Sequence, residues 1–598
     1  MLRTHTCGEL RATHVDQKVT LCGWVHRRRD HGGLIFIDLR DRYGFTQIVV
    51  DPKNREVFAE AEHVRPEWVL KVSGTARKRL EGAERIDTPT GEIEVTANEL
   101  TVLNEAKTPP FEIDQPSRDA LRLAGQEKTV NEELRLEYRF LDLRRERMQR
   151  NIALRHQTCR LIREYFDRHG FLEIETPDLV KGTPEGSREY LVPSRLHRGS
   201  FYVLPQSPQQ LKQLLMVAGF DKYFQIARCF RDEDQRGDRQ PEFTQFEIEM
   251  SFCEQEDILT VMERCFIEVT ERLQPDRRIT PKPFHRLTWR EALEKYGSDK
   301  PDLRCDLPLT NVTDLVKGTS FKTFSEEVKK GGVVSALRVP KGAEFTHGEI
   351  DELTLLAKNH GAKGLAYLAV KPDRLQSPIL TYLGEETAQN IVERTGAKPQ
   401  DLIFFGAGEF EAALTPLGKV RQAIGGKLGL IDSSQWNFVW IVEFPLFERN
   451  RETGKLDARH HPFTRPHSDD VHLLDSDPLA VRAIAHDLVL NGVEIGGGSV
   501  RIHEADLQAK VFDLLGISKA DAQRRFGHML KAFQYGAPPH GGIAMGLDRY
   551  IMLLSGEPNI REVIAFPKDQ AARDLMMGAP APMPEEQLRE LGIKIIEE

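Results

Sequence analysis

Residues 205–250, PQSPQQLKQLLMVAGFDKYFQIARCFRDEDQRGDRQPEFTQFEIEM, contain two runs with the alternation of β-strands on either side of a charged turn. Polar side chains share one face of each run: Gln225, Arg231 and Glu233 on the first, and Gln245, Glu247 and Glu249 on the second. Gly237 and Pro241 interrupt the segment between the runs, which predicts an antiparallel hairpin with a long loop. Burial of a polar face without partners is costly, so this face either lines a ligand-binding cleft or lies in water.

The composition of the 598-residue chain is that of a globular protein with about three or four domains. Its apolar runs are far shorter than the ~20 residues of a membrane span, and its N-terminus lacks the pattern of a secretory signal. We therefore expect a cytoplasmic protein with no membrane partner. The seven scattered cysteines are interpreted as reduced thiols, because no pair has metal-binding spacing.

The N-terminal region, residues 1–105, contains five short strand-like segments separated by turns, which predicts a small OB-fold barrel. The net charge of −9 argues against broad nucleic-acid binding, but the run HRRR at 26–29 could form a local basic site. Arg29, Phe36 and Gln47 lie on or beside the second and third strands, where such barrels bind single-stranded nucleic acid. Phe36 is either a base-stacking side chain or part of the barrel core.

The middle of the chain combines a linker, a helix and an insertion. Residues 106–140 carry proline and charge, which predicts a linker that continues into a helix. Apolar residues at helical spacing predict a helix over 147–169, followed by a strand that ends at Pro177. Residues 183–193, TPEGSREYLVP, form either a loop that closes over a ligand or a plain connector. Residues 309–428 alternate helix and strand signals, which indicates an inserted domain.

The C-terminal third contains further charged residues in glycine-rich surroundings. The pattern predicts a helix over about 478–491 that carries Asp487, followed by a strand with Glu494 and Arg501. The three glycines between these last two residues either allow a bulge that turns both side chains toward one pocket or let a ligand approach the backbone. GGIAMGLDRYIMLLSG then predicts a strand that enters a helix, with Arg549 in the first turn, where a bound anion would stabilise the cation.

Taken in order, these segments closely resemble the class II aminoacyl-tRNA synthetases, and among them the bacterial aspartyl type. GFLEIETP at 170–177 is similar to motif 1, FRDED and RQPEFTQ at 230–245 to motif 2, and GLDR at 546–549 to motif 3. QSPQ, HHPFT and GGGSVR occur in the family's order. GLDR alone would be weak evidence, whereas the ordered set is highly specific and covers essentially the whole chain.

The resemblance implies an α+β multidomain fold built around an antiparallel six-stranded sheet flanked by helices, with homodimerisation through motif 1. The implied divisions are an OB-fold anticodon-binding domain (1–105), a hinge or linker (106–140), an N-terminal catalytic segment (141–308), an inserted α/β GAD domain (309–428), a C-terminal catalytic segment (429–565) and a C-terminal extension (566–598).

The implied reaction activates L-aspartate with ATP and transfers the aspartyl group to the 3′ end of tRNA(Asp). The residues to which the resemblance assigns catalysis are Arg231, Glu233 and Arg549. The implied aspartate-binding residues are Glu185, Gln209, Lys212, Arg231, Glu247, His460 and Arg501. The implied ATP-binding residues are Arg231, Asp232, Glu233, Gln240, Glu494, Gly546, Leu547, Asp548 and Arg549. Mg²⁺, which accompanies ATP, would be bound by Asp487 and Glu494.

Two features of the resemblance bear on specificity. Lys212 and Arg501 would clamp the side-chain carboxylate of aspartate, and asparagine would leave these cations without a counter-charge, a penalty of several kcal/mol. The family usually has Asp within a TQ-x-D pattern where this chain has Glu247, so the substrate contact of that carboxylate is in doubt.

The implied anticodon contacts are Arg29, His31, Phe36, Gln47 and Gly82. Many bacterial relatives have Leu at the position of His31, and His31 together with Gly82 resembles the non-discriminating enzymes that charge both tRNA(Asp) and tRNA(Asn). The alternatives are an asparaginyl-tRNA synthetase, a tRNA-free asparagine-forming paralogue, and a catalytically inactive synthetase-like RNA-binding protein. Lys212 argues against the first, the N-terminal barrel against the second, and the intact charged positions against the third.

Overall fold

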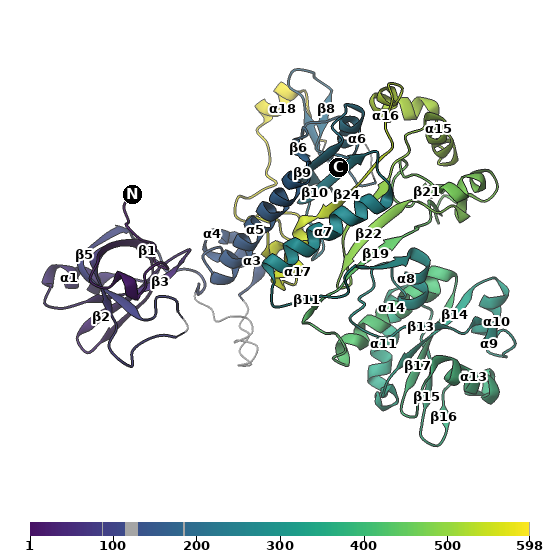
Figure 1. The fold of residues 1–598 in the computed structure, drawn as a ribbon, viewed down its shortest axis with the longest axis horizontal. Coiled ribbons are helices and arrows are strands. Elements are labelled where there is room, and N and C mark those ends of the chain that lie inside the picture. The colour runs from purple at the N-terminus through teal and green to yellow at the C-terminus, as the bar shows by residue number, and fades with distance from the viewer. Residues whose placement is uncertain (87, 114–129, 183–185, 597–598) are drawn as a thin grey trace. The chain divides into compact units, whose positions relative to one another are not determined.

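The computed structural model describes residues 1–86, 88–113, 130–182 and 186–596 (Figure 1). Residues 114–129 of the predicted linker and the start of the predicted loop at 183–193 therefore lie outside the described residues. The chain forms two compact units: Met1–Ala153 with Arg561–Pro582, and Leu154–Ile560 with Met583–Glu598. No helix in the described ranges is long and apolar enough to cross a membrane. The division into six functional segments stays a prediction.

The first unit contains the predicted barrel, closed in the order β1-β2-β3-β5-β4. Its strands are β1 (Lys18–His31), β2 (Leu34–Asp41), β3 (Gly44–Val50), β4 (Val69–Lys78) and β5 (Ile93–Asn104). Alternate side chains such as Leu21, Ile37 and Val72 fill its interior, as the period of two requires. The short turn η1 (Ala12–His14) precedes β1, and helix α1 (Arg55–His63), capped by the Asn54 side chain, follows β3.

Charged side chains hold the rest of the first unit together. Helices α3 (Glu132–Glu137) and α4 (Arg139–Asp142) precede the long α5 (Glu146–Arg168), along which the two units divide after Ala153. Arg135 donates hydrogen bonds to Asp142 at 3.0 Å and to Glu562 at 2.6 Å, and all three side chains are buried. Such paired burial attaches the segment Arg561–Pro582 to α3 and α4, because either charge left alone would be strongly destabilising.

The second unit is built on an eight-stranded sheet with the order β12-β19-β22-β23-β24-β10-β9-β6. The strands are β6 (Leu172–Glu173), β9 (Lys222–Phe230), β10 (Glu242–Ser251), β12 (His285–Thr288), β19 (Phe438–Val442), β22 (Ala485–Leu490), β23 (Val493–Val500) and β24 (His540–Gly546). The six central strands are antiparallel, as predicted. The edge strands β12 and β6 add parallel pairings at the two sides.

The opening hairpin is confirmed as β9 and β10, which pair in antiparallel register with Gln225 opposite Glu247. Helix α5 ends before Gly170, whose φ of +74° is the left-handed conformation that favours glycine after a helix. Apolar side chains of α5 and the hairpin, including Phe166, Phe224 and Phe246, pack together with ring centroids 4.9 to 6.5 Å apart.

The helix predicted over 478–491 is wrong. Only the short turn η4 (Pro478–Ala480) is helical, and Asp487 lies on strand β22. Asn491 and Gly492, with φ of 51° and 84°, form the tight turn between β22 and β23. An Asn-Gly pair between apolar runs is a strong hairpin signal, and this local turn chemistry prevails over the helical spacing of the preceding residues. A register shift between Leu488 and Val489 leaves Ile495 of β23 without an opposite residue, so the strand has a bulge directly before the three glycines.

The insertion has its own antiparallel sheet, in the order β13-β14-β17-β15-β16. These strands are β13 (Leu309–Asn311), β14 (Val333–Val339), β15 (Ala366–Val370), β16 (Leu375–Gln376) and β17 (Leu402–Gly408). The helices around them are α9 (Thr313–Val316), α10 (Lys322–Lys329), η2 (Gly342–Glu344), α11 (His347–Asn359), α12 (Leu380–Leu383), α13 (Glu385–Thr395) and α14 (Phe410–Lys427). The alternation of helix and strand signals in residues 309–428 is confirmed by these elements.

Helices cover the larger sheet and short pairs extend its loops. The helices are α6 (Gln209–Val217), α7 (Gln255–Leu273), α8 (Trp289–Tyr296), α15 (Ala505–Leu514), α16 (Lys519–Phe533), α17 (Leu547–Ser555) and α18 (Glu585–Leu591), with the short turns η3 (Ser468–Asp475) and η5 (Ile560–Glu562). The short strands are β7 (Leu191–Pro193), β8 (Phe201–Val203), β11 (Arg278–Ile279), β18 (Gln435–Trp436), β20 (Phe447–Arg449) and β21 (Leu456–Ala458).

Candidate active site

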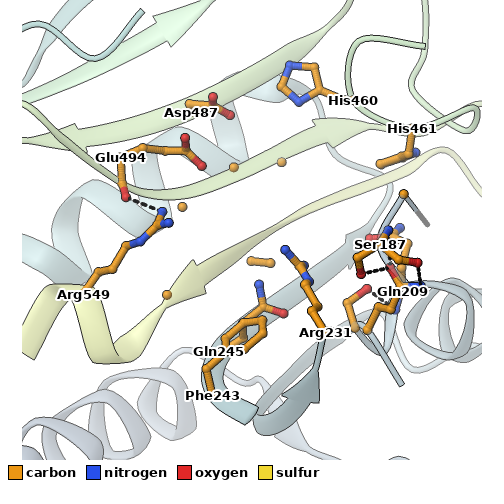
Figure 2. Close-up of a pocket in the computed structure, with 18 of the residues that line it drawn as sticks. Ser187, Gln209, Arg231, Phe243, Gln245, His460, His461, Asp487, Glu494 and Arg549 are labelled. Carbon is orange, nitrogen blue, oxygen red and sulfur yellow. Dashed lines mark hydrogen bonds between the residues drawn. The ribbon is translucent and has the colours of Figure 1, made fainter. Parts of the chain in front are cut away.

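A cavity of about 620 Å³ lies on the polar face of the large sheet (Figure 2). Gly496, Gly497 and Ala544, on the central strands β23 and β24, form some of its wall. A Cβ at Gly497 would lie 2.5 Å from Oδ1 of Asp487, so glycine at this position leaves room for that carboxylate. Arg231, Glu233 and Gln245 of the hairpin's polar face also line the cavity, whereas Glu247 and Glu249 are buried. The polar face of the hairpin is therefore not a solvent-facing sheet surface.

Arg231 lies on the hairpin side of the cavity, directly after β9 (Figure 2). Its backbone N–H donates to Pro241 O at 2.8 Å, and its guanidinium lies 5.1 Å from the centroid of the Phe243 ring. The Nε of Arg231 is buried and has no hydrogen-bond acceptor among the described residues. A guanidinium that is held by its neighbours and lacks an acceptor is prepared to bind an anionic ligand.

The loop between β9 and β10 carries three further predicted residues. Glu233 accepts a hydrogen bond from Arg239 at 3.0 Å, and both side chains line the cavity. Gln240 is buried and also lines the cavity. The N–H of Asp232 donates to Arg188 O, and Asp232 lies outside the cavity wall.

The GLDR segment carries Arg549 into the cavity at the start of α17. Nη1 of Arg549 donates to the Glu494 carbonyl at 3.1 Å, and Nη2 lies 3.1 Å from Oδ2 of Asp238. Gly546 lines the cavity, whereas Leu547 belongs to the core. Half-exposed Asp238 belongs to the hairpin loop, so an anion of higher charge could take its place on the guanidinium.

Asp548 borders the cavity, but both of its carboxylate oxygens bond to other groups of the protein. One carboxylate oxygen accepts the Thr244 N–H at 2.8 Å, and the other accepts from the Arg155 guanidinium. Arg155 also donates to the Thr244 hydroxyl at 2.9 Å. These bonds attach α17 to β10 and α5, and thereby position Arg549.

The carboxylates of Asp487 and Glu494 lie together on neighbouring strands β22 and β23 (Figure 2). Burial and then the nearby Glu494 charge raise the pKa of Asp487 well above its ordinary value. Burial opposes ionisation of Glu494 as well, but the ammonium of Lys300, 2.5 Å away, lowers the pKa of Glu494. Two crowded carboxylates of this kind gain from a cation between them.

Arg501 lies in the cavity wall and belongs to a cluster of four buried charged side chains. Its Nε donates to Oε1 of Glu249 at 3.0 Å, and Nζ of Lys212 lies 3.4 Å from Oε2 of Glu249 and 2.9 Å from Oε2 of Glu247. Burial alone would raise the pKa of Glu249, but the Arg501 and Lys212 charges hold it below its usual value. Arg501 lines the cavity, whereas Lys212 and Glu247 lie behind its wall.

Two adjacent histidines complete this end of the cavity. His461 Nε2 is 2.7 Å from Nη1 of Arg501, so it is the histidine in direct contact with the predicted clamp. His460 stacks edge-on against Phe444 and its buried Nε2 has no partner within the described ranges of the chain. Burial lowers the pKa of His460 to about 4, and burial followed by the Arg501 charge lowers the pKa of His461 well below its ordinary value.

The structure thus brings together most of the predicted site. The predicted residues that line the cavity are Gln209, Arg231, Glu233, Gln240, His460, Asp487, Glu494, Arg501, Gly546, Asp548 and Arg549. Glu185 lies outside the described residues. The cavity is also lined by His461, Lys300 and Phe243, to which the sequence assigned no role. Of these, His461 could have been predicted, because it follows His460 in the HHPFT motif.

The predicted anticodon residues lie in the first unit, and three of them, Arg29, Phe36 and the buried Gln47, lie on the barrel strands β1 to β3. Arg29 donates to both oxygens of Asp38 at 3.0 Å, and Gln47 donates to Glu94 at 3.0 Å. Phe36 pairs with Arg29 across β1 and β2 and is half-buried outside the core, between the core residues Ile35 and Ile37. A ring beside a guanidinium on an outer barrel face is suited to base stacking.

The other two predicted anticodon residues lie at turns. His31 is the exposed last residue of β1. Gly82 has a φ of +84° in the exposed LEGAE loop, a conformation that favours glycine.

Comparison with known proteins agrees with this geometry. Residues 131–570 match the family described as tRNA synthetases class II (D, K and N), and residues 19–103 match the OB-fold nucleic acid binding domain. The chain belongs to this class II family and is a ligase, as the sequence predicts.

Among curated proteins, the chain is similar over nearly its whole length to enzymes named aspartate–tRNA(Asp/Asn) ligase. It is 54% identical to the aspartate–tRNA(Asp/Asn) ligase of Rubrobacter xylanophilus over 593 residues, which cover 99% of this chain and 97% of the relative. It is 50% identical over 595 residues to the ligase of the same name from Natranaerobius thermophilus, covering 99% and 100%. The aspartyl-tRNA synthetase of Entamoeba histolytica shares the fold, with a TM-score of 0.59 at 20% identity over 94% of this chain and 91% of that chain.

Proposed function

We propose that this chain joins L-aspartate to tRNA(Asp) and also to tRNA(Asn), with aspartyl-adenylate as the intermediate. The observation that carries the proposal is the placement of three arginines, Arg231, Arg501 and Arg549, around one cavity of about 620 Å³. The two anionic groups of aspartate and the triphosphate of ATP provide the matching negative charge. The names of the curated relatives support the same substrates.

Arg231 is suited to the reacting groups because it lines the hairpin side of the cavity and its Nε has no acceptor among the described residues. A guanidinium there can contact the α-carboxylate of aspartate and the α-phosphate of ATP together, which holds nucleophile and electrophile in line. Arg549 lies near the carboxylate pair and would bind the outer phosphates after leaving Asp238. Glu233 and Gln240 would hold the nucleotide.

Asp487 and Glu494 fit a magnesium ion, because two crowded carboxylates are the hard oxygen ligands that Mg²⁺ prefers. When bound, the ion would supply positive charge to the phosphates of ATP. The protein's own contribution is to keep both carboxylates on a short, tightly turned hairpin that faces the cavity.

Specificity for aspartate would come from Arg501 in the cavity wall, supported by Lys212 behind it. The cluster contains two cations and the two carboxylates Glu247 and Glu249. The cations therefore have counter-charges without substrate, and discrimination would rest on hydrogen bonding: a substrate carboxylate would accept from the Arg501 guanidinium, whereas the NH₂ group of asparagine would place a donor against it. Gln209 and Glu185 are the proposed contacts of the rest of the amino acid.

The two-tRNA charging assay tests substrate, activity and tRNA scope together. Purified protein, ATP, Mg²⁺ and [¹⁴C]aspartate are expected to charge transcripts of both tRNA(Asp) and tRNA(Asn), because His31 and Gly82 resemble the residues of the non-discriminating enzymes. Both lie in exposed parts of the barrel, where an anticodon can reach them. Asparagine in place of aspartate should give no charging of either transcript. Charging of tRNA(Asp) alone would contradict the dual scope, and charging with asparagine would favour the asparaginyl alternative.

We also propose a homodimer that forms at the β6 edge of the large sheet. Leu172, Phe220 and Phe252 are 53%, 43% and 74% exposed. The register places them at one end of β6, β9 and β10, since Leu172 is opposite Tyr223 and Met250 is opposite Lys222. Exposed apolar side chains beside an open strand edge are typical of a subunit interface.

Leu172→Glu is expected to convert the dimer to a monomer in light scattering after size-exclusion chromatography, because it places a charge in the apolar interface. Leu355→Glu is the matched control, since Leu355 is 59% exposed on α11 of the insertion. Dimers of unchanged stability for Leu172→Glu would contradict this choice of interface.

A further inference from the structure

Lys300 is a cation of the cavity wall that lies outside the predicted site. It belongs to the loop between α8 and β13, and its Nζ lies 2.5 Å from Oε2 of Glu494. Its neighbour Asp299 also lines the cavity. The ammonium thus already occupies one side of the carboxylate pair proposed to bind Mg²⁺.

The loop that carries Lys300 is held by the inserted domain. Arg421, a buried residue of α14, donates hydrogen bonds to the backbone carbonyls of Asp302 at 3.0 Å, Cys305 at 2.5 Å and Leu307 at 2.8 Å. A guanidinium that satisfies three carbonyls of one loop restricts the conformations available to that loop. Removal of Arg421 would take one donor from each of these carbonyls, and of the three Cys305 O would keep the bond from the Leu307 N–H at 3.1 Å.

The same loop is held from its other side by the hairpin that carries both carboxylates. Asp302 packs on the turn between β22 and β23, where a Cβ on Gly492 would lie only 3.0 Å from the Asp302 Cβ. Asp302 also accepts a bond from Arg304 at 2.7 Å. The loop is therefore clamped between α14 and the hairpin, which presents Lys300 to Glu494.

The position of Lys300 has a consequence for any cation that approaches the same carboxylate. Two positive charges on one carboxylate repel each other, so a divalent ion must displace the ammonium or share Glu494 with it. Lys295 differs from Lys300 in this respect: it pairs with Glu291 on the surface of α8 at 3.8 Å, and neither residue lines the cavity.

We propose that Lys300 is a positioning residue that weakens the binding of a divalent cation at Asp487 and Glu494 while no nucleotide is present. The phosphate chain of ATP offers the ammonium another anionic partner, so the metal position opens when ATP is bound. The inserted domain contributes by holding the loop through Arg421. This inference rests on the proposed function, in which the two carboxylates bind Mg²⁺.

The test measures Mn²⁺ binding by electron paramagnetic resonance in the absence of nucleotide, and counts only the binding that Glu494→Gln abolishes. Lys300→Met is expected to bind Mn²⁺ about tenfold more tightly than the wild type, because one competing positive charge is removed. With a non-hydrolysable ATP analogue present, the two proteins should differ by less than about threefold, since the competing charge then pairs with phosphate.

Lys295→Met is the matched control and should bind Mn²⁺ as the wild type does. Lys300→Arg keeps the charge and should also stay close to the wild type. Equal or weaker nucleotide-free binding by Lys300→Met would overturn the inference. Aspartate-dependent pyrophosphate exchange by the wild type is measured separately, so a failure of the proposed function is recognised independently of the Mn²⁺ result.

Discussion

Arg231→Ala is expected to reduce aspartate-dependent exchange of pyrophosphate into ATP by about 10³-fold or more, in line with the loss of a preorganised group that stabilises transition-state charge. The physical reason is the position of the guanidinium, which lies against the Phe243 ring at the cavity while its Nε stays without an acceptor in the described structure. The Pro241 carbonyl fixes the backbone N–H of Arg231. Since the native side chain has few partners to lose, the protein should keep its fold and its thermal stability.

Arg228→Ala is the control for this experiment. Arg228 lies three residues earlier on β9, pairs with Glu242 at 2.6 Å and does not line the cavity. It should retain exchange within about threefold of the wild type, because exposed ion pairs contribute only about 1 kcal/mol or less. Arg231→Lys should restore little activity, since an ammonium cannot form the two parallel bonds of a guanidinium. Substantial exchange by folded Arg231→Ala would refute the central role of this residue.

Acidification from pH 7 to pH 5 is expected to destabilise the second unit by several kcal/mol. Burial lowers the pKa of His460 to about 4 and that of His486 to about 3, against about 6.5 for unfolded histidine. Both stay neutral in the folded state while the unfolded chain takes up protons. Their contribution is present above pH ~6.5 and is lost as the pH falls toward the folded pKa, at about 2 kcal/mol for each by pH 5.

Burial also lowers the pKa of His461 and His540, which adds to the same trend. Urea unfolding followed by tryptophan fluorescence provides the measurement, because Trp436 and Trp440 are buried in this unit and the His486 ring lies 6.1 Å from the Trp440 ring. In His486→Gln, the free energy of unfolding should depend less steeply on pH, because one proton fewer is taken up on unfolding. The control His285→Gln, at an exposed position, should keep the wild-type pH dependence. A stability that stays constant from pH 7 to pH 5 would contradict neutral burial of these rings.

Local sequence was sufficient where a short-range pattern has one physical solution. The alternation through Gln245, Glu247 and Glu249 can be satisfied only by a strand with a polar face, and β10 is that strand. The glycine-rich run before Arg549 likewise predicted a strand that enters a helix, and β24 and α17 confirm it. The ordered motifs indicated the family, which the comparisons confirm.

The same reasoning failed where two local signals competed. Residues 478–491 have helical spacing and a proline at a suitable starting position, but the Asn491–Gly492 turn pairs Ala485–Leu490 with β23 as a strand. The consequence for the site is large, because Asp487 then faces Glu494 across a hairpin. The resemblance had also placed Asp487 and Glu494 at one metal site, but the sequence pattern placed Asp487 on a helix before the strand that carries Glu494.

Local patterns were enough to specify the strand and helix content of the hairpin and of the GLDR segment, the barrel, and the residue types available for chemistry, because each depends on neighbours a few positions apart. Which charges meet was settled by tertiary packing. Lys212 comes from α6 and reaches Glu247 and Glu249 on β10, and Lys300 reaches Glu494 across 194 positions. Such contacts follow from how the elements pack, and no local periodicity encodes them.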